Sequence, residues 1–143
     1  MNIRAAISIS CTLLGLTACD GLDRMDATNH EAVQKGQTIY IEHCAICHGM
    51  NLEGQPNWRS PKDDGTLPAP PHDDSGHTWH HDDQLLFDYT KGGGVAIAPK
   101  GFQSGMPGFE DILSDEQIWQ VLSFIKSRWS PQNQARQERL SQR

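Results

Sequence analysis

The sequence has few cysteines, no excess of positive charge and no convincing β-strand pattern. Its four cysteines include only one Cys-x-x-Cys pair, which argues against a zinc ribbon or finger built from two such pairs. The formal net charge is −6, which disfavours a nucleic-acid partner because binding to phosphates relies on Lys and Arg. Without strand patterns or internal repeats, the sequence predicts one all-α domain.

The apolar run at the N-terminus is too short to remain as a membrane-spanning helix. It covers residues 5–16 and is diluted by serine and threonine, whereas a spanning helix needs about 20 apolar residues. The four residues before it form a short, positively charged stretch that ends in Arg4. This pattern predicts a secretory signal peptide over residues 1–18.

The end of this segment, Leu16-Thr17-Ala18-Cys19, resembles the bacterial lipoprotein box. The resemblance implies that Cys19 becomes the first mature residue and carries acyl chains, of which two or three give stable anchoring. The alternative is ordinary signal-peptide cleavage that leaves Cys19 unmodified. Asp20 resembles an inner-membrane retention signal of enteric bacteria. We therefore expect an exported protein, lipid-anchored on the periplasmic side of the inner membrane of a Gram-negative bacterium, with residues 19–27 as a tether.

The most specific motif is Cys44-Ala45-Ile46-Cys47-His48, the attachment signal of a c-type haem. Two thiols three positions apart face the same side of one helical turn, so both can form thioethers with the haem vinyl groups. His48 then lies under the iron as its proximal nitrogen ligand. A thiol–disulfide enzyme would need a βαβ pattern around the pair, which is absent. The single motif predicts one haem per chain.

Two long helices are predicted at the ends of the domain. The first begins at Thr28 and leads one face into the haem motif; the last begins with a capping box over residues 114–117 and ends before Pro131. Gly36 lies within the first helix, where glycine costs about 1 kcal/mol of helix propensity. We expect the last helix to cross the first at Gly36, with Tyr40 beside the contact.

A middle helix is predicted from about Asp82 to Lys91, where three glycines end it. The connection over residues 52–81 is long for a compact domain. A haem explains it, because loop side chains can pack on the porphyrin.

This order of elements resembles the class I c-type cytochromes over residues 28–130. The resemblance implies a cytochrome c fold, with three to five helices around one covalently bound haem and with crossed first and last helices. Residues 131–143 would be a polar tail, which we expect to be disordered. The resemblance also implies a methionine sulfur as the second iron ligand, from a loop before the last helix. Met106 fits, since Met50 is too close to His48 and Met25 lies in the tether.

Further contacts with the haem follow from the same resemblance. A proline carbonyl in the loop after the motif accepts a hydrogen bond from the other ring nitrogen of the ligand histidine, and Pro70 is the preferred candidate. Trp58, Trp79 and Arg59 are candidates for hydrogen bonds to the haem propionates. For each of these three, simple packing or solvent exposure is the alternative.

Four histidines lie within ten residues: His72, His77, His80 and His81. Together with neighbouring aspartates they are competent for copper or zinc. The alternative is a polar surface loop with one histidine hydrogen-bonded to the haem edge, because a His-rich stretch is only a compositional signal.

With both iron positions filled by protein, the chain is expected to carry single electrons between redox proteins and not to act as an enzyme. An acidic carrier should dock weakly on basic patches of its partners. Two alternatives remain: a haem sensor or peroxidase-like enzyme with an open sixth site, and a copper-handling cytochrome that uses the loop from His72 to His81.

Overall fold

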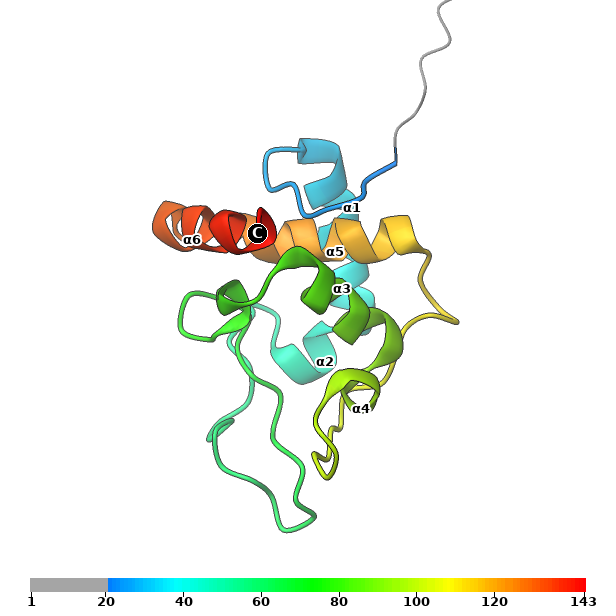
Figure 1. Ribbon diagram of the computed structural model, residues 1–143, viewed down its shortest axis with the longest axis vertical. Helices are drawn as coiled ribbons and strands as arrows, with labels where there is room; N and C mark the ends of the chain where they lie inside the picture. The colour runs from blue at the N-terminus through cyan, green and yellow to red at the C-terminus, as the bar shows by residue number, and fades with distance from the viewer. Residues whose placement is uncertain (1–20) are drawn as a thin grey trace, which may run out of the picture.

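The computed structural model describes residues 21–143, so the predicted signal peptide (residues 1–18) and Cys19 lie outside the described residues. The described part is all-helical and has no strand, as the sequence predicts. It has six α-helices instead of the expected three to five, and none of them is long and apolar enough to span a bilayer. In chain order (Figure 1), the elements are α1 (His30–His43), α2 (Ala45–His48), the 3₁₀ helix η1 (Thr78–His80), α3 (Asp83–Gly92), α4 (Gly94–Ile97), α5 (Asp115–Ser127) and α6 (Pro131–Ser141).

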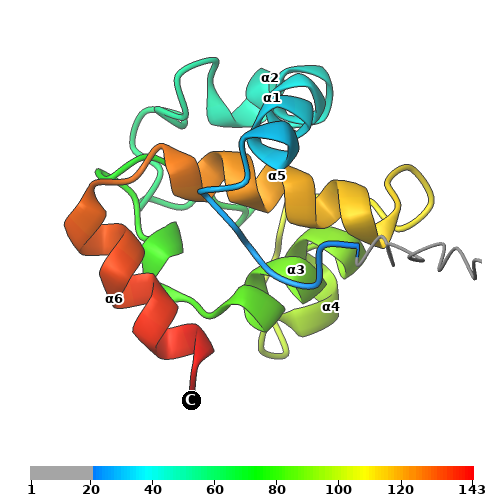
Figure 2. The same cartoon turned by 90° about the horizontal axis from the view of Figure 1, so that it is seen from above.

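Helix α5 forms the centre of the domain. It begins with the predicted capping box: Gln117 N donates to Ser114 Oγ at 3.2 Å, and Ser114 N donates to the Gln117 side chain at 2.9 Å. Every residue from Ile118 to Lys126 is buried. Figure 2 shows the reason, since α5 lies between α1 on one side and α3 with α4 on the other.

Helices α1 and α5 cross at Gly36, as predicted. A Cβ added to Gly36 would lie 1.9 Å from the backbone oxygen of Gln120, so only glycine allows this approach. Beside the crossing, the rings of Tyr40 and Phe124 lie 5.4 Å apart. The start of α1 differs by one residue from the prediction: Asn29, not Thr28, accepts the capping hydrogen bond.

The segment before α1 is part of the domain and not a free tether. Met25 is only 2% exposed, and its backbone N–H donates to Asp83 at 3.1 Å. The next backbone N–H, of Asp26, donates to Ser123 Oγ at 2.9 Å. Lys126 donates to the Met25 carbonyl at 3.4 Å. Figure 2 shows this segment running across α5, which leaves only the residues before it to act as a tether.

The expectation of a disordered tail is wrong, because Pro131–Ser141 forms α6. Proline is favourable at the first position of a helix, where its missing N–H is not needed. Gln137, on α6, is fully buried and donates to the His81 carbonyl at 3.3 Å and to Asp83. Asn133, one turn earlier, donates to Asp74 at 2.7 Å. Helix α6 therefore holds the histidine-rich segment in place.

Candidate haem site

A cavity of about 670 Å³ lies beside α5, and the walls include all three residues of the predicted attachment motif, Cys44, Cys47 and His48. Its size is in the range of cofactor sites, about 300–1,000 Å³. Helix α5 contributes an apolar wall from its face opposite the N-terminal segment: Val121, Leu122 and Ile125 line the cavity. Helix α3 and the long loops complete the enclosure.

The side chain of His48 is buried and held by a backbone carbonyl. It is 7% exposed, and its Nδ1 lies 2.9 Å from the Pro70 carbonyl oxygen, the contact expected from the resemblance. Since a carbonyl can only accept, Nδ1 carries the proton and Nε2 keeps its lone pair for a metal. Burial lowers the pKa of His48, although the hydrogen bond to Pro70 opposes this shift. The net lowering of the pKa favours the neutral ring, and the hydrogen bond to Pro70 fixes its tautomer.

The two cysteines of the motif are present as free thiols and not as a disulfide. Cys47 is exposed, whereas burial, helped by the nearby Cys47, raises the pKa of Cys44 to about 11. Thiol–disulfide enzymes instead lower the pKa of their reactive cysteine, to about 3.5–7. The raised pKa of Cys44 is the opposite of what a dithiol redox enzyme needs in its reactive cysteine.

Met106 reaches the same cavity from a loop packed against the end of α3. Gly93 follows α3 with a φ of +80°, and a Cβ added there would lie 2.6 Å from Gly108 N. The Met106 carbonyl accepts from Gly94 N at 3.2 Å, and the Met106 N–H donates to Ser104 Oγ at 3.1 Å. These contacts fix the backbone on both sides of the thioether side chain. Ligation of the iron by Met106 stays a prediction.

His72 is a site residue whose role the sequence reasoning missed. Its ring stacks on the His48 ring with centroids 4.0 Å apart and planes 23° apart. Nδ1 of His72 is hydrogen-bonded to Thr78 Oγ1 at 2.8 Å. Burial lowers the pKa of His72 well below its usual range. The one signal in the sequence was its position two residues after Pro70, the residue whose carbonyl lies beside His48.

Another wall of the cavity is a stack of aromatic rings. Trp58 and His77 lie parallel with centroids 5.3 Å apart, and the ring of His81 meets His77 edge-on at 5.4 Å. These three side chains line the cavity, while the Arg59 guanidinium covers Trp58 at 3.9 Å. Burial lowers the pKa values of both His77 and His81. The predicted contact of Trp58 and Arg59 with haem propionates is compatible with this placement but is not tested by it.

Trp79 is placed differently from Trp58. It does not line the cavity; its ring stacks on His80 at 3.8 Å, and Arg136 of α6 lies 5.0 Å from its centroid. Its indole N–H is nevertheless buried and has no hydrogen-bond acceptor. A buried donor without a partner is unusual, so a propionate contact for Trp79 stays a prediction.

The histidine-rich segment does not form a second metal site. Within residues 21–143, no three or more His, Cys, Asp or Glu side chains come together as a metal site would require. His72 faces His48, His77 faces Trp58, and His80 accepts a hydrogen bond from Arg136 at 3.1 Å. The copper-handling alternative therefore has no support in the described structure.

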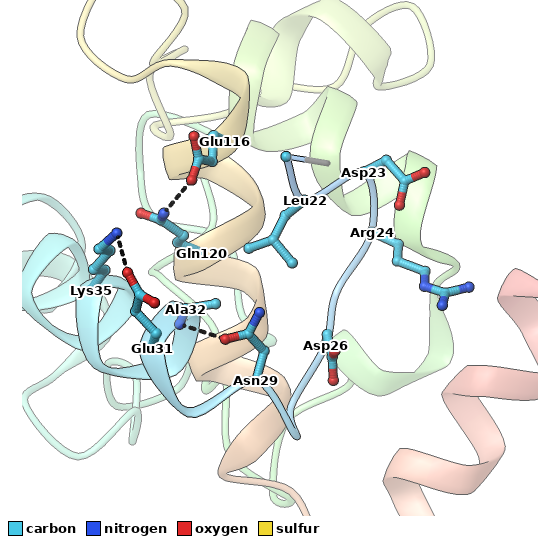
Figure 3. Close-up of a pocket in the computed structure, with 11 residues that line it drawn as sticks. Leu22, Asp23, Arg24, Asp26, Asn29, Glu31, Ala32, Lys35, Glu116 and Gln120 are labelled. Atoms are coloured by element: carbon cyan, nitrogen blue, oxygen red, sulfur yellow. Dashed lines mark hydrogen bonds and ion pairs between the residues drawn. The ribbon is translucent and has the colours of Figure 1, made fainter. Parts of the chain in front are cut away.

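A smaller pocket of about 340 Å³ lies between the N-terminal segment, the start of α1 and α5 (Figure 3). Its lining is mostly polar and includes no cysteine, histidine or methionine. Lys35 pairs with Glu31 at 2.8 Å, and Gln120 donates to Glu116 at 3.0 Å. These side chains stabilise the helices themselves, so this pocket is not a candidate cofactor site.

The larger cavity fits a c-type haem. It combines two thiols one helical turn apart, an imidazole whose Nε2 is free, a thioether and apolar walls. Each of these groups matches a part of the cofactor: the vinyl groups, the iron and the porphyrin ring. The smaller pocket has no such set of donors.

Comparison with protein families agrees with this geometry. The Cytochrome c family model matches residues 33–129, which is well over half of the chain. The matched range contains the attachment motif, Pro70 and Met106. Searches of curated proteins and of solved structures gave no match. On the strength of the family model and the all-helical fold, the chain belongs to the cytochrome c family.

Proposed function

We propose that this chain is a class I cytochrome that carries one electron at a time on a single haem, with His48 and Met106 as the iron ligands. Haem-based electron transfer follows from the family; the number of haems and the ligand pair are our proposal. One observation carries it: a tautomer-fixed imidazole and a backbone-fixed thioether line one cavity, although 58 positions separate them in sequence.

The residues of the chain would support this role by keeping the two iron ligands in a rigid arrangement. A bound haem iron supplies a reversible one-electron change. Pro70 fixes the imidazole of His48, and the contacts of Gly94 and Ser104 fix the loop of Met106. The buried α5 face keeps water away from the cofactor. A protein that supplies both ligands leaves no iron position for a substrate.

The test of this ligand pair is the binding of carbon monoxide to the reduced protein. Wild type should bind it poorly, because Met106 occupies the sixth position, and Met106→Ala should bind it readily. Met50→Ala is the matched control, since Met50 is 61% exposed and does not line the cavity. Ready binding by wild type would instead favour a sensor or peroxidase-like enzyme with an open site.

We further propose that the mature protein is lipid-anchored through Cys19 on the periplasmic side of the inner membrane and exchanges electrons with other redox proteins. The burial of Met25 supports a short anchor, because only about five residues separate Cys19 from the folded domain. Mass spectrometry of the mature N-terminus tests the lipid. Wild type should carry acyl chains and fractionate with the inner membrane, whereas Cys19→Ser should lose both properties.

A further inference from the structure

We propose that His72 is a positioning residue for His48: its ring packs flat on the ligand ring and fixes the rotation of that ring about its bond to iron. The proposal rests on His48 being the proximal ligand. It adds a role for a residue that the attachment motif does not contain.

Two different contacts hold His48, and they act in different directions. The hydrogen bond to Pro70, at 2.9 Å, holds one edge of the ring. By itself a single hydrogen bond at Nδ1 leaves the plane of the ring free to tilt. The His72 ring covers a face of His48 at 4.0 Å and 23°, which opposes this tilt. Edge and face together define one ring plane.

His72 can act in this way because it is itself fixed. Thr78, only 6% exposed, is hydrogen-bonded to its Nδ1 at 2.8 Å. The backbone of His72 is also held: its carbonyl accepts from the buried Trp129 Nε1 at 2.7 Å, and its N–H donates to Leu52 O at 2.8 Å. The ring therefore cannot turn away from His48 without breaking its part-buried hydrogen bond with Thr78, which would leave a polar group without its partner.

A histidine here does more than fill space. An aliphatic side chain would fill the same volume, but it could neither stack on an imidazole nor bond to Thr78. A stacked aromatic pair has a preferred geometry, whereas an aliphatic contact does not. Contacts around a ligand histidine that set its orientation also tune the metal. The orientation of the imidazole plane sets how unpaired electron density spreads over the porphyrin, so it has a direct spectroscopic signature.

The experiment is proton NMR of the oxidised holoprotein, in which the hyperfine-shifted haem methyl resonances report the plane of the axial imidazole. His72→Leu removes the ring and the link to Thr78, and it should change the order or spread of these resonances. Thr78→Val removes only the link and should give a smaller change in the same direction. His72→Phe keeps the stack and should remain closer to wild type than His72→Leu does.

His80→Leu is the matched control. His80 lies in the same segment, but it does not line the cavity and contacts Trp79 and Arg136 instead. The haem methyl resonances of this variant should therefore match those of wild type. A wild-type methyl pattern in His72→Leu would overturn the proposal. If His72→Leu does not fold, a wild-type pattern in Thr78→Val together with a changed pattern in His72→Phe would overturn it. If the iron of the wild-type protein is high-spin, the proposed ligand pair is wrong. The optical spectrum distinguishes this failure from a failure of the proposal for His72.

Discussion

Histidines with lowered pKa values are the most unusual feature of this domain at the scale of single residues. His77 and His81 line the cavity next to each other, and their pKa values are lowered by burial first and by neighbouring histidines second. Among the charged groups nearby, Arg59 lowers the pKa of His77 further, and Asp82 opposes the shift of His81. The domain therefore gains stability from rings that stay unprotonated.

This arrangement predicts a stability that falls in mild acid. Unfolded histidine has a pKa of about 6.5, so below that pH the unfolded chain binds more protons than the folded one. The stabilisation should be complete above about pH 6.5 and should be lost as the pH falls through the lowered folded values. Urea unfolding between pH 7.5 and 5.5 should show this decline, and the double variant His77→Asn, His81→Asn should flatten it.

His30→Asn is the control and should keep the wild-type slope, because His30 is exposed, lies outside the cavity and contributes to neither pKa shift. A stability that rises as the pH falls would contradict the account. That sign would mean that the folded rings have raised pKa values, as they would if each were paired with a carboxylate.

At the scale of elements, the crossing of α1 and α5 organises the domain. It brings the helix that leads into the attachment motif against the helix that forms an apolar wall of the cavity. Tyr40 extends this link: its hydroxyl donates to the Gly49 carbonyl at 2.9 Å, directly after the motif. The position of the haem motif relative to the cavity wall thus depends on how closely the two helices approach.

Gly36→Ala should therefore destabilise the protein although alanine is the better helix former. The new Cβ would meet backbone, not a flexible side chain, at 1.9 Å. Overpacking costs about 1–3 kcal/mol, and the gain in helix propensity offsets about 1 kcal/mol of it. Because the contact is with rigid backbone, the upper end of this range applies, and we expect a net loss of about 2 kcal/mol in the free energy of unfolding by urea. Gly21→Ala, whose Cβ would meet nothing within 4 Å and which does not line the larger cavity, should change it by less than about 0.5 kcal/mol; equal losses in both variants would contradict this explanation.

The sequence was informative where local chemistry decides the structure. The attachment motif, the capping box of Ser114 and Gln117 and the close contact at Gly36 all depend on residues within one turn or on the size of one side chain. The hydrogen bond from His48 to Pro70 was also expected, although only the family resemblance indicated it.

It was uninformative where burial depends on distant partners. Residues 131–143 look like a solvated tail because their sequence is polar, but Asp74 and Asp83 offer acceptors that lie more than 50 positions away. Met25 was expected in a tether because the residues that hold its backbone, Asp83 and Lys126, are distant in sequence. Only the folded structure brings them together. The stacking of His72 on His48 likewise needs the loop and η1 to be in place.

At the scale of the whole molecule, net charge is the property that acts on an approaching partner at the longest range. The chain carries 18 acidic against 12 basic residues, a formal net charge of −6. Such a surface attracts cations and basic proteins over a distance set by screening, about 8 Å at physiological ionic strength. It steers encounter more than it adds affinity.

The rate of electron exchange with small redox reagents should therefore depend on salt with a sign set by the reagent. With a cationic hexaammine ruthenium complex, the second-order rate constant measured by stopped flow should fall as ionic strength rises. With anionic ferricyanide it should rise, because screening removes repulsion. Reversed trends, a rise with the ruthenium complex and a fall with ferricyanide, would show that the local charge at the electron-transfer edge is opposite in sign to the net charge.

The central claim is a haem iron held by His48 and Met106, and the near-infrared edge of the oxidised optical spectrum tests it most directly. A sulfur–iron bond gives a weak charge-transfer band there. We predict this band in wild type and in Met50→Ala, and its loss in Met106→Ala. A wild-type spectrum without the band, or a band that survives in Met106→Ala, would contradict the account.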